Sequence, residues 1–473
     1  MVNRVFTAPV FPLRSTIHDP RSTRLIAGLA AFIFALTPLA ADAGGLIRDA
    51  EIEHTLRAYA DPIFTAAGIP PEDVRVLIVD DPSINAYVAG GLNMFIHTGI
   101  ILAADKPGML IGVMAHETGH IAGAHLSQMG EKSTRAMLGG AIGALIGVAA
   151  IAAGGSNGAA AGGGIIMGSQ SMAQRQFMGD IRQNETSADQ AGLRFLDSLD
   201  ISGSGMLEMF EKLRLDEQSH NTQTDPFLRD HPLTSDRIGV MRDHVNESSV
   251  PKDQVPAAFV MMHARMRAKL IGFTKPYSEV LADYPLTDAS VPARYARAIA
   301  DFKRGKLADA LNGMNRLIAE QPQDAFFYDT KGQMLFENGR LKDAADAYAS
   351  AARYAPRNAL ILTDEAGCFT AQENPALLPR AVALLEQSKE IDDSYDVTWR
   401  ELAIAYGRQG RMGLSYMALA EEASLSGDYK TVLQHVARAR TYQSDDPSLG
   451  LKLDDLEHDA KAQLKAKKDQ DLF

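Results

Sequence analysis

The sequence has little cysteine or tryptophan and no excess of positive charge. Of its 473 residues, one is a cysteine (Cys368) and one is a tryptophan (Trp399). A single cysteine excludes an internal disulfide and a zinc site built from several thiolates. Because 47 Lys and Arg stand against 59 Asp and Glu, the formal net charge is −12, and we expect no binding to nucleic acid. The length allows two or three domains.

The N-terminal apolar run is too short for an ordinary membrane span. Arg21 and Arg24 precede Leu25–Leu36, a run of about twelve residues, where a span needs about 20. Ala41-Asp42-Ala43 follows in the A-x-A form of a cleavage site. We therefore predict a signal peptide over residues 1–43, with a retained anchor as the alternative. Export of a chain without disulfides favours the periplasm of a Gram-negative bacterium.

Residues Leu110–Leu126 contain an H-E-x-x-H motif, His116-Glu117-Thr118-Gly119-His120. Positions four apart lie on one face of a helix, so His116 and His120 can bind a single Zn²⁺. Glu117 is placed to activate a zinc-bound water by accepting its proton. The alternative is an ordinary buried helix that matches the motif by chance.

Two histidines leave a catalytic zinc short of a ligand, and two candidates follow in the sequence. His125 lies on the opposite helix face from His116 unless the helix breaks at Gly123. Glu185 is the better candidate, because it shares a helix face with Asp189, four residues later. One of these carboxylates can bind the metal while the other accepts the N–H of a ligand histidine. A salt-bridged helix face is the alternative.

The segment before the motif indicates a helix followed by short strands. Apolar residues at helical spacing predict a helix over 44–67, and Val74–Val79 is typical of a strand. Two more strands are expected around Gly90-Gly91. The second of them, Asn93–His97, could hold an extended substrate at a sheet edge by β-augmentation. We interpret His97 as a surface strand residue and not as a ligand.

An uncharged stretch, Met137–Ala173, separates the two metal-binding segments. A single membrane crossing here would place His116 and Glu185 on opposite sides of a bilayer, which a shared metal forbids. Two crossings need about forty apolar residues and a turn. We therefore expect a hairpin near the active site that contacts a membrane surface or an outer-membrane partner. A glycine-rich loop is the alternative.

The C-terminal part of the chain repeats every 34 residues. Alanine, glycine, leucine and proline recur at this spacing, in the sets Ala298, Gly332 and Ala366, Gly305 and Gly339, Leu307 and Leu341, Ala310 and Ala344, and Pro322 and Pro356. A three-residue slip at 374–379 precedes Ala403 and Gly410, and a looser unit runs from Asp428 to about Leu464. This is the tetratricopeptide period, whose stacked helix pairs bind peptides or proteins on a concave face.

The motif H-E-T-G-H followed by E-T-S-A-D resembles the gluzincin metallopeptidases of family forty-eight. With a signal peptide and a repeat tail, the chain is similar to periplasmic members along nearly its whole mature length. The resemblance implies an α+β, mainly α, zincin-like fold with a small β-sheet, followed by an all-α solenoid. It also implies one Zn²⁺ per chain, bound by His116, His120 and Glu185, with Glu117 as the general base.

The family also has an H-P element after the ligand helix, which His231-Pro232 matches. The resemblance implies that His231 approaches the zinc, either as a cap at rest or to stabilise the oxyanion. Arg237 is a weaker candidate for orienting the site. We expect a zinc metalloprotease domain over 44–275, a linker over 276–291 and the repeats over 292–473.

These observations lead to one functional hypothesis and one rival. The first is a zinc metalloendopeptidase of the periplasm that degrades misfolded or stalled outer-membrane β-barrel proteins and can assist their assembly. Its repeats would contact outer-membrane assembly machinery, and residues 137–173 a membrane surface. The rival is a chaperone or scaffold that works through the repeats and keeps zinc as structure. A complete ligand set with Glu117 as the base favours the protease.

Overall fold

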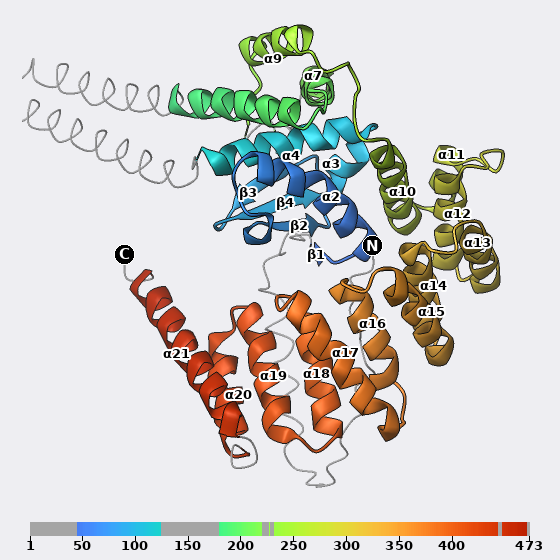
Figure 1. Ribbon diagram of the computed structural model, residues 1–473, viewed down its shortest axis with the longest axis vertical. Helices are drawn as coiled ribbons and strands as arrows, with labels where there is room; N and C mark the ends of the chain where they lie inside the picture. The colour runs from blue at the N-terminus through green and yellow to red at the C-terminus, as the bar shows by residue number, and fades with distance from the viewer. Residues whose placement is uncertain (1–44, 124–178, 220–226, 228–230, 443–446, 471–473) are drawn as a thin grey trace, which may run out of the picture. The chain divides into compact units, whose positions relative to one another are not determined.

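The computed structural model describes residues 45–123, 179–219, 227, 231–442 and 447–470 (Figure 1). The predicted signal peptide, the uncharged stretch 137–173 and His125 lie outside these ranges. The chain divides into two compact units. Ile52–Ile271 makes up most of the first unit, and Gly272–Phe473 most of the second.

The first unit contains a four-stranded sheet in the order β1-β2-β4-β3. Its strands are β1 (Leu46–Ile47), β2 (Arg75–Val79), β3 (Ala86–Ala89) and β4 (Asn93–His97). Strand β4 runs parallel to β2 and antiparallel to β3. The prediction that Asn93–His97 forms a free edge is therefore wrong, because this strand is paired on both sides. The edge next to it belongs to β3.

Side-chain alternation explains why these strands form a sheet with one buried face. Ala86, Val88, Met94 and Ile96 are buried, whereas the rings of Tyr87 and Phe95 stack with centroids 4.9 Å apart. The β3–β4 turn is made by Gly90 and Gly91, whose φ angles of 58° and 96° favour glycine. A period of two with glycines in the turn is the pattern expected of a hairpin.

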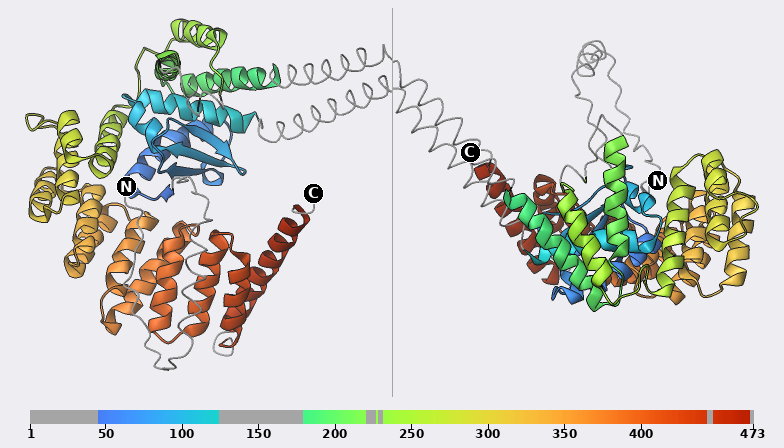
Figure 2. Two further views of the ribbon diagram at one scale, coloured as in Figure 1. Left: turned by 180° about the vertical axis from the view of Figure 1, so that it is seen from behind. Right: turned by 90° about the horizontal axis from the view of Figure 1, so that it is seen from above.

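Helices surround the sheet. They are α2 (Ala50–Ala66), α3 (Thr98–Ala103), α4 (Pro107–Ala122), a helical segment over 179–198, α7 (Ser204–Ser219), α9 (Ser235–Glu247) and α10 (Ala257–Thr274); η1 (Pro71–Asp73) is a short 3₁₀ turn. Of these, α4 packs next to β3, and α7 packs on α4. Figure 2 shows α4 and the 179–198 helix side by side. The helix expected over 44–67 begins only at Ala50, because Leu46 and Ile47 pair with β2.

Helix α4 is buried along its sides from Pro107 to Gly119. It begins with Pro107, whose missing N–H costs nothing at a first helical position. Glycines bring it close to α7: a Cβ on Gly112 would lie 2.5 Å from Met206 Cα, and one on Gly205 would lie 2.2 Å from the Gly108 carbonyl carbon. The helix that carries H-E-x-x-H is thus fixed at the centre of the first unit.

The second unit consists of paired helices in the part that the structure describes. They are α11 (Tyr277–Asp283), α12 (Val291–Lys303), α13 (Leu307–Glu320), α14 (Ala325–Glu337), α15 (Leu341–Tyr354), α16 (Ala359–Thr370), η2 (Pro375–Leu377), α17 (Leu378–Ile391), α18 (Asp396–Arg408), α19 (Met412–Leu425), α20 (Tyr429–Arg440) and α21 (Pro447–Gln470). Helix α11 lies inside the expected linker 276–291.

Glycines with positive φ mark the turns at the repeat spacing. Gly305, Gly339 and Gly410 have φ angles of 79°, 72° and 78°. The first two are 34 residues apart, and the third follows after two periods and the three-residue slip. The predicted class, α+β and mainly α with a small sheet, is confirmed, and the helical C-terminal region is consistent with the repeats. Of the described helices, none combines the length and apolar character of a membrane span.

Candidate metal centre

Helix α4 presents two histidines on one face, one turn apart. The Nε2 atoms of His116 and His120 are 3.1 Å apart, and their rings meet edge to face at 4.7 Å. His116 is fully buried, and the His120 side chain is 11% exposed. The predicted pair therefore points its nitrogens at one position.

Glu185 reaches the same position from the 179–198 helix. Its Oε2 lies 3.4 Å from His116 Nε2, and its Oε1 lies 3.3 Å from His120 Nε2. The side chain is 5% exposed. Gly192 lies where the 179–198 helix crosses α4. A Cβ on this residue would lie 3.1 Å from the backbone nitrogen of His116, so glycine allows the close approach.

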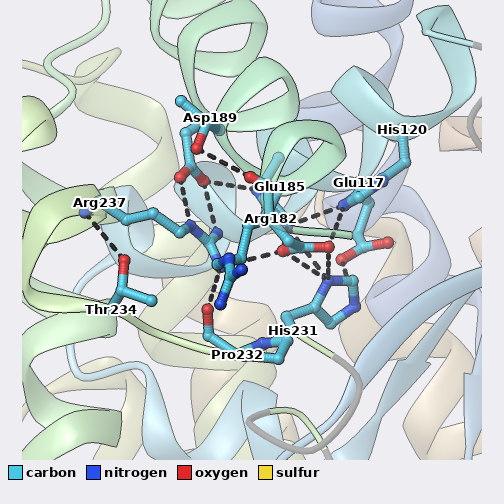
Figure 3. Close-up of polar contacts among 11 residues, drawn as sticks. Glu117, His120, Arg182, Glu185, Asp189, His231, Pro232, Thr234 and Arg237 are labelled. Carbon is cyan, nitrogen blue, oxygen red and sulfur yellow. Dashed lines mark hydrogen bonds and ion pairs between the residues drawn. The ribbon is translucent and has the colours of Figure 1, made fainter. Parts of the chain in front are cut away.

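His231 completes the group from the segment before α9 (Figure 3). Its Nδ1 lies 3.3 Å from His116 Nε2 and 3.2 Å from Glu185 Oε2. Its backbone N–H donates to the Phe227 carbonyl at 2.7 Å, and the rings of Phe227 and His231 are 4.7 Å apart. His231 is thus held in a buried, aromatic surrounding.

The four ligand atoms of His116, His120, Glu185 and His231 all lie within 4.8 Å of one another. Zinc–nitrogen bonds of about 2.0–2.1 Å in a tetrahedron imply ligand–ligand separations of about 3.3 Å. The five separations given above, which involve both oxygens of Glu185, run from 3.1 to 3.4 Å, and the remaining pair, His120 and His231, lies within 4.8 Å. Three imidazoles and a carboxylate, all buried, are donors that zinc accepts, so the residues fit a tetrahedral metal ion.

Asp189 and Arg237 support this group from behind. Asp189 Oδ1 lies 2.8 Å from His116 Nδ1, on the ring edge that faces away from the other ligands. Arg237 donates to both Asp189 oxygens, from Nε at 2.6 Å and from Nη2 at 2.9 Å. The pKa of Asp189 is lowered, because the hydrogen bonds from Arg237 and His116 outweigh the effect of burial, which raises it. The carboxylate is therefore charged.

The electrostatics of the site favour a cation. Burial lowers the pKa of His116, but the carboxylates of Asp189 and Glu185 outweigh this effect and raise it to about 9. The pKa of Glu185 is lowered, because its bonds to His116 and His231 outweigh its burial. A position that stabilises positive charge on an imidazole also stabilises a metal ion.

Glu117 lies beside the group and not in it. Its side chain is 1% exposed, and its Oε1 is 3.5 Å from His231 Nε2. Within the described ranges, Glu117 Oε1 has no hydrogen-bond partner. Burial raises the pKa of this carboxyl, although the charges of His231 and His116 oppose the shift. A carboxylate with a raised pKa and a free oxygen suits a proton acceptor.

Sequence reasoning missed several contributors to the site. Phe210 and Phe227 pack against His116, with ring centroids at 5.4 and 6.4 Å, and nothing in the motif spacing points to them. The interpretation of His97 as a surface residue is wrong. His97 is buried, with Nδ1 2.9 Å from Ser83 Oγ, and among the described residues it does not join the converging group.

Comparison with known proteins agrees with this geometry. Residues 47–245 match the family model described as "Peptidase family M48". The chain is 25% identical to the "Beta-barrel assembly-enhancing protease" of Escherichia coli (strain K12) over 315 residues, which are 64% of this chain and 63% of that protein. It is 24% identical to the protein of the same name from Yersinia pestis over 365 residues, 74% of this chain and 71% of that protein.

A third relative, the "Putative beta-barrel assembly-enhancing protease" of Vibrio cholerae, is 26% identical over 58% of this chain and 57% of its own length. The chain thus spans less than two thirds of the Escherichia coli relative. The matched segment 47–245 contains His116, His120, Glu185 and His231, the side chains that converge in the structure. Residues 47–245 of the chain therefore form a domain of peptidase family M48.

Proposed function

We propose that the protein is a zinc endopeptidase. The observation that carries the proposal is the convergence of four buried ligand atoms, from His116, His120, Glu185 and His231, beside the Glu117 carboxylate. A structural zinc site would need the four ligands alone. A buried carboxylate next to them, whose Oε1 has no hydrogen bond among the described residues, supports catalysis instead.

In this proposal, His116, His120 and Glu185 hold the metal, and Asp189 fixes the His116 ring through Nδ1. When bound there, a zinc ion supplies a Lewis acid that polarises the scissile carbonyl and lowers the pKa of a water molecule to about 7. Glu117 accepts the proton of the attacking water on its carboxylate. The same carboxyl group then donates that proton to the nitrogen of the leaving amine.

His231 has a second role in the proposal, as a cap. Its Nδ1 faces the other ligand atoms, while its Nε2 faces Glu117. In this arrangement, one ring occupies the open metal position and also covers the base. The orientation supports the cap over oxyanion stabilisation, and activity then requires that His231 moves away.

We also propose that the substrate backbone pairs with the edge of β3. Asn93–His97 is paired on both sides, so Ala86–Ala89 is the strand beside it that can accept an additional strand. Helix α4 packs next to β3, which keeps this edge near the ligands. An extended peptide on β3 would present its carbonyls along the face of the site.

Substrates and location follow from the relatives and from the N-terminal segment. The names of the relatives support outer-membrane β-barrel proteins as substrates and a role in their assembly. The pattern Arg21–Ala43 supports export to the periplasm of a Gram-negative bacterium. The helix pairs of the second unit would contact substrates or the outer-membrane assembly machinery, and residues 137–173 would contact a membrane surface.

Metal removal tests the proposal. Purified mature protein should contain about one zinc per chain by elemental analysis and should degrade an unfolded β-barrel protein. Treatment with 1,10-phenanthroline should abolish degradation, and stoichiometric zinc should restore it. Degradation that survives complete zinc removal would contradict the proposal. Zinc without any degradation, including after His231→Ala, would favour the rival scaffold function.

A further inference from the structure

The donor groups of the Arg237 side chain contact the carboxylates of the metal centre and the residue after His231. Nε and Nη2 donate to the two oxygens of Asp189, at 2.6 and 2.9 Å. Nη1 donates to the Pro232 carbonyl at 2.8 Å and lies 3.0 Å from Glu185 Oε2. The side chain is 3% exposed, and Figure 3 shows its guanidinium between Asp189 and Pro232.

Helix capping explains how the arginine reaches this position. Thr234 is the N-cap of α9, and its hydroxyl accepts the backbone N–H of Arg237 at 3.3 Å. Arg237 therefore lies in the first turn of α9, five residues after Pro232 and six after His231. Its guanidinium can turn back toward the segment that carries His231.

These contacts join two parts of the site that the chain brings in separately. Asp189 and Glu185 belong to the 179–198 helix, whereas the Pro232 carbonyl belongs to the residue directly after His231. Among the described residues, the Pro232 bond is the hydrogen bond that ties the Arg237 guanidinium to that segment. If His231 leaves the metal position by a movement of its backbone segment, this bond must break or move with it.

We propose that Arg237 is a positioning residue that holds His231 over the metal by its bond to the Pro232 carbonyl. Asp189 clamps the guanidinium in a bidentate pair, which fixes the direction of Nη1. A planar fork can bind Asp189 and the carbonyl at once, whereas the single ammonium of lysine cannot. The inference rests on the proposed metal site but needs no peptidase activity.

The substitution Arg237→Lys tests whether the planar guanidinium is needed or whether a positive charge at this position is enough. The lysine keeps a cation next to Asp189 and Glu185, so the three other ligands are retained, but it loses the fork that holds Pro232. The matched control is Arg242→Lys on the same helix, because Arg242 is 52% exposed and pairs with Glu211 on the surface. We expect the control to behave as the wild type.

The test is a cycle of full-length variants loaded with Co²⁺, whose visible absorption reports the number and type of ligands. Wild type, Arg237→Lys, His231→Ala and the double variant are titrated with Co²⁺ alone. In the wild-type background, Arg237→Lys should weaken Co²⁺ binding about tenfold and shift the spectrum toward that of His231→Ala. In the His231→Ala background, it should change the affinity less than twofold and leave the spectrum unchanged.

An equal loss of affinity in both backgrounds would overturn the proposal, because Arg237 would then act through Asp189 or Glu185. If Arg237→Lys does not fold by circular dichroism, Arg237→Gln takes its place in the cycle. If neither variant folds, the proposal is overturned in favour of a role in core stability. Absence of Co²⁺ binding by the wild type would instead contradict the metal site itself.

Discussion

A Cβ atom on Gly119 would lie 2.5 Å from the carbonyl oxygen of Ala188 and 2.8 Å from its Cα. Gly119 is the second variable position of H-E-x-x-H, and Ala188 lies between Glu185 and Asp189 on the neighbouring helix. The two helices therefore touch backbone to backbone. This close approach is what allows Glu185 Oε2 to lie 3.4 Å from His116 Nε2.

Gly119→Ala should weaken metal binding without removing a ligand. An extra methyl group in backbone contact costs about 1–3 kcal/mol when the neighbours must move. Because that movement separates Glu185 from the histidines, we expect zinc affinity to fall about tenfold or more in a chelator competition assay.

The matched control is Gly239→Ala in α9, where a Cβ would meet nothing within 4 Å. Alanine at this helical position should keep full zinc affinity and leave the melting temperature equal or higher, because glycine costs about 0.5–1 kcal/mol inside a helix. Equal zinc affinity for both variants would show that the close approach of the two helices at Gly119 is not needed for zinc binding.

The ligand assignment predicts a graded loss of zinc. His116→Ala and Glu185→Ala should each lose most of the bound metal in elemental analysis. Asp189→Asn should bind zinc with an affinity lower by about 10–100-fold, because Asp189 supports the ligand His116 and does not itself bind the metal. If Glu185→Ala keeps full zinc and His125→Ala does not, the third ligand is His125 and the assignment is wrong.

His231→Ala should raise proteolysis if His231 caps the metal. A capped site binds substrate only in the fraction of molecules that are open, so removal of the cap increases that fraction. Self-cleavage and substrate turnover are measured with zinc content matched to the wild type. A fall of about 10²-fold would instead assign His231 to oxyanion stabilisation. No change in either assay would remove His231 from the site.

His263 should make the first unit less stable in acid. Its Nε2 donates to the Ala104 carbonyl at 2.8 Å, and burial lowers its pKa to about 4, with Arg267 adding to the shift and Asp105 opposing it. The unfolded chain, with a pKa near 6.5, takes up a proton below that pH while the folded chain does not. Stability is therefore lost between pH 6.5 and 4, by up to about 3 kcal/mol.

His263→Gln keeps an N–H donor for Ala104 and removes the titration. Denaturant unfolding at pH 7.5, 5.5 and 4.5, with both proteins in the same metal state, measures the difference. The variant should lose less stability than the wild type as the pH falls. Parallel pH profiles for the two proteins would show that His263 does not contribute to acid sensitivity.

The chemistry of the site could be predicted from local spacing, because H-E-x-x-H and E-x-x-x-D each lie on one helix. His231 could not be placed by spacing, since a loop histidine has no periodicity, and only the family resemblance pointed to it. The order of the strands could not be predicted either. The residues of Asn93–His97 do not show that this strand pairs with β2, a segment separate from it in the chain. Phe210 and Phe227 have no chemical signature at all.

Arg237 shows the same limit in a single residue. The sequence places it six positions after His231 and gives it an orienting role at most. Its contacts with Asp189, Glu185 and Pro232 depend on how α9 packs against the 179–198 helix. Spacing along the chain does not encode this tertiary packing, and the packing determines which groups the Arg237 guanidinium contacts.

Peptide hydrolysis by Glu117→Gln, with zinc content measured on the same sample, tests the central claim most directly. The substitution keeps the side-chain volume and removes the proton acceptor beside the ligands. The account predicts one zinc per chain, an unchanged melting temperature and no cleavage of an unfolded β-barrel protein. Cleavage at the wild-type rate by the zinc-loaded variant would contradict it.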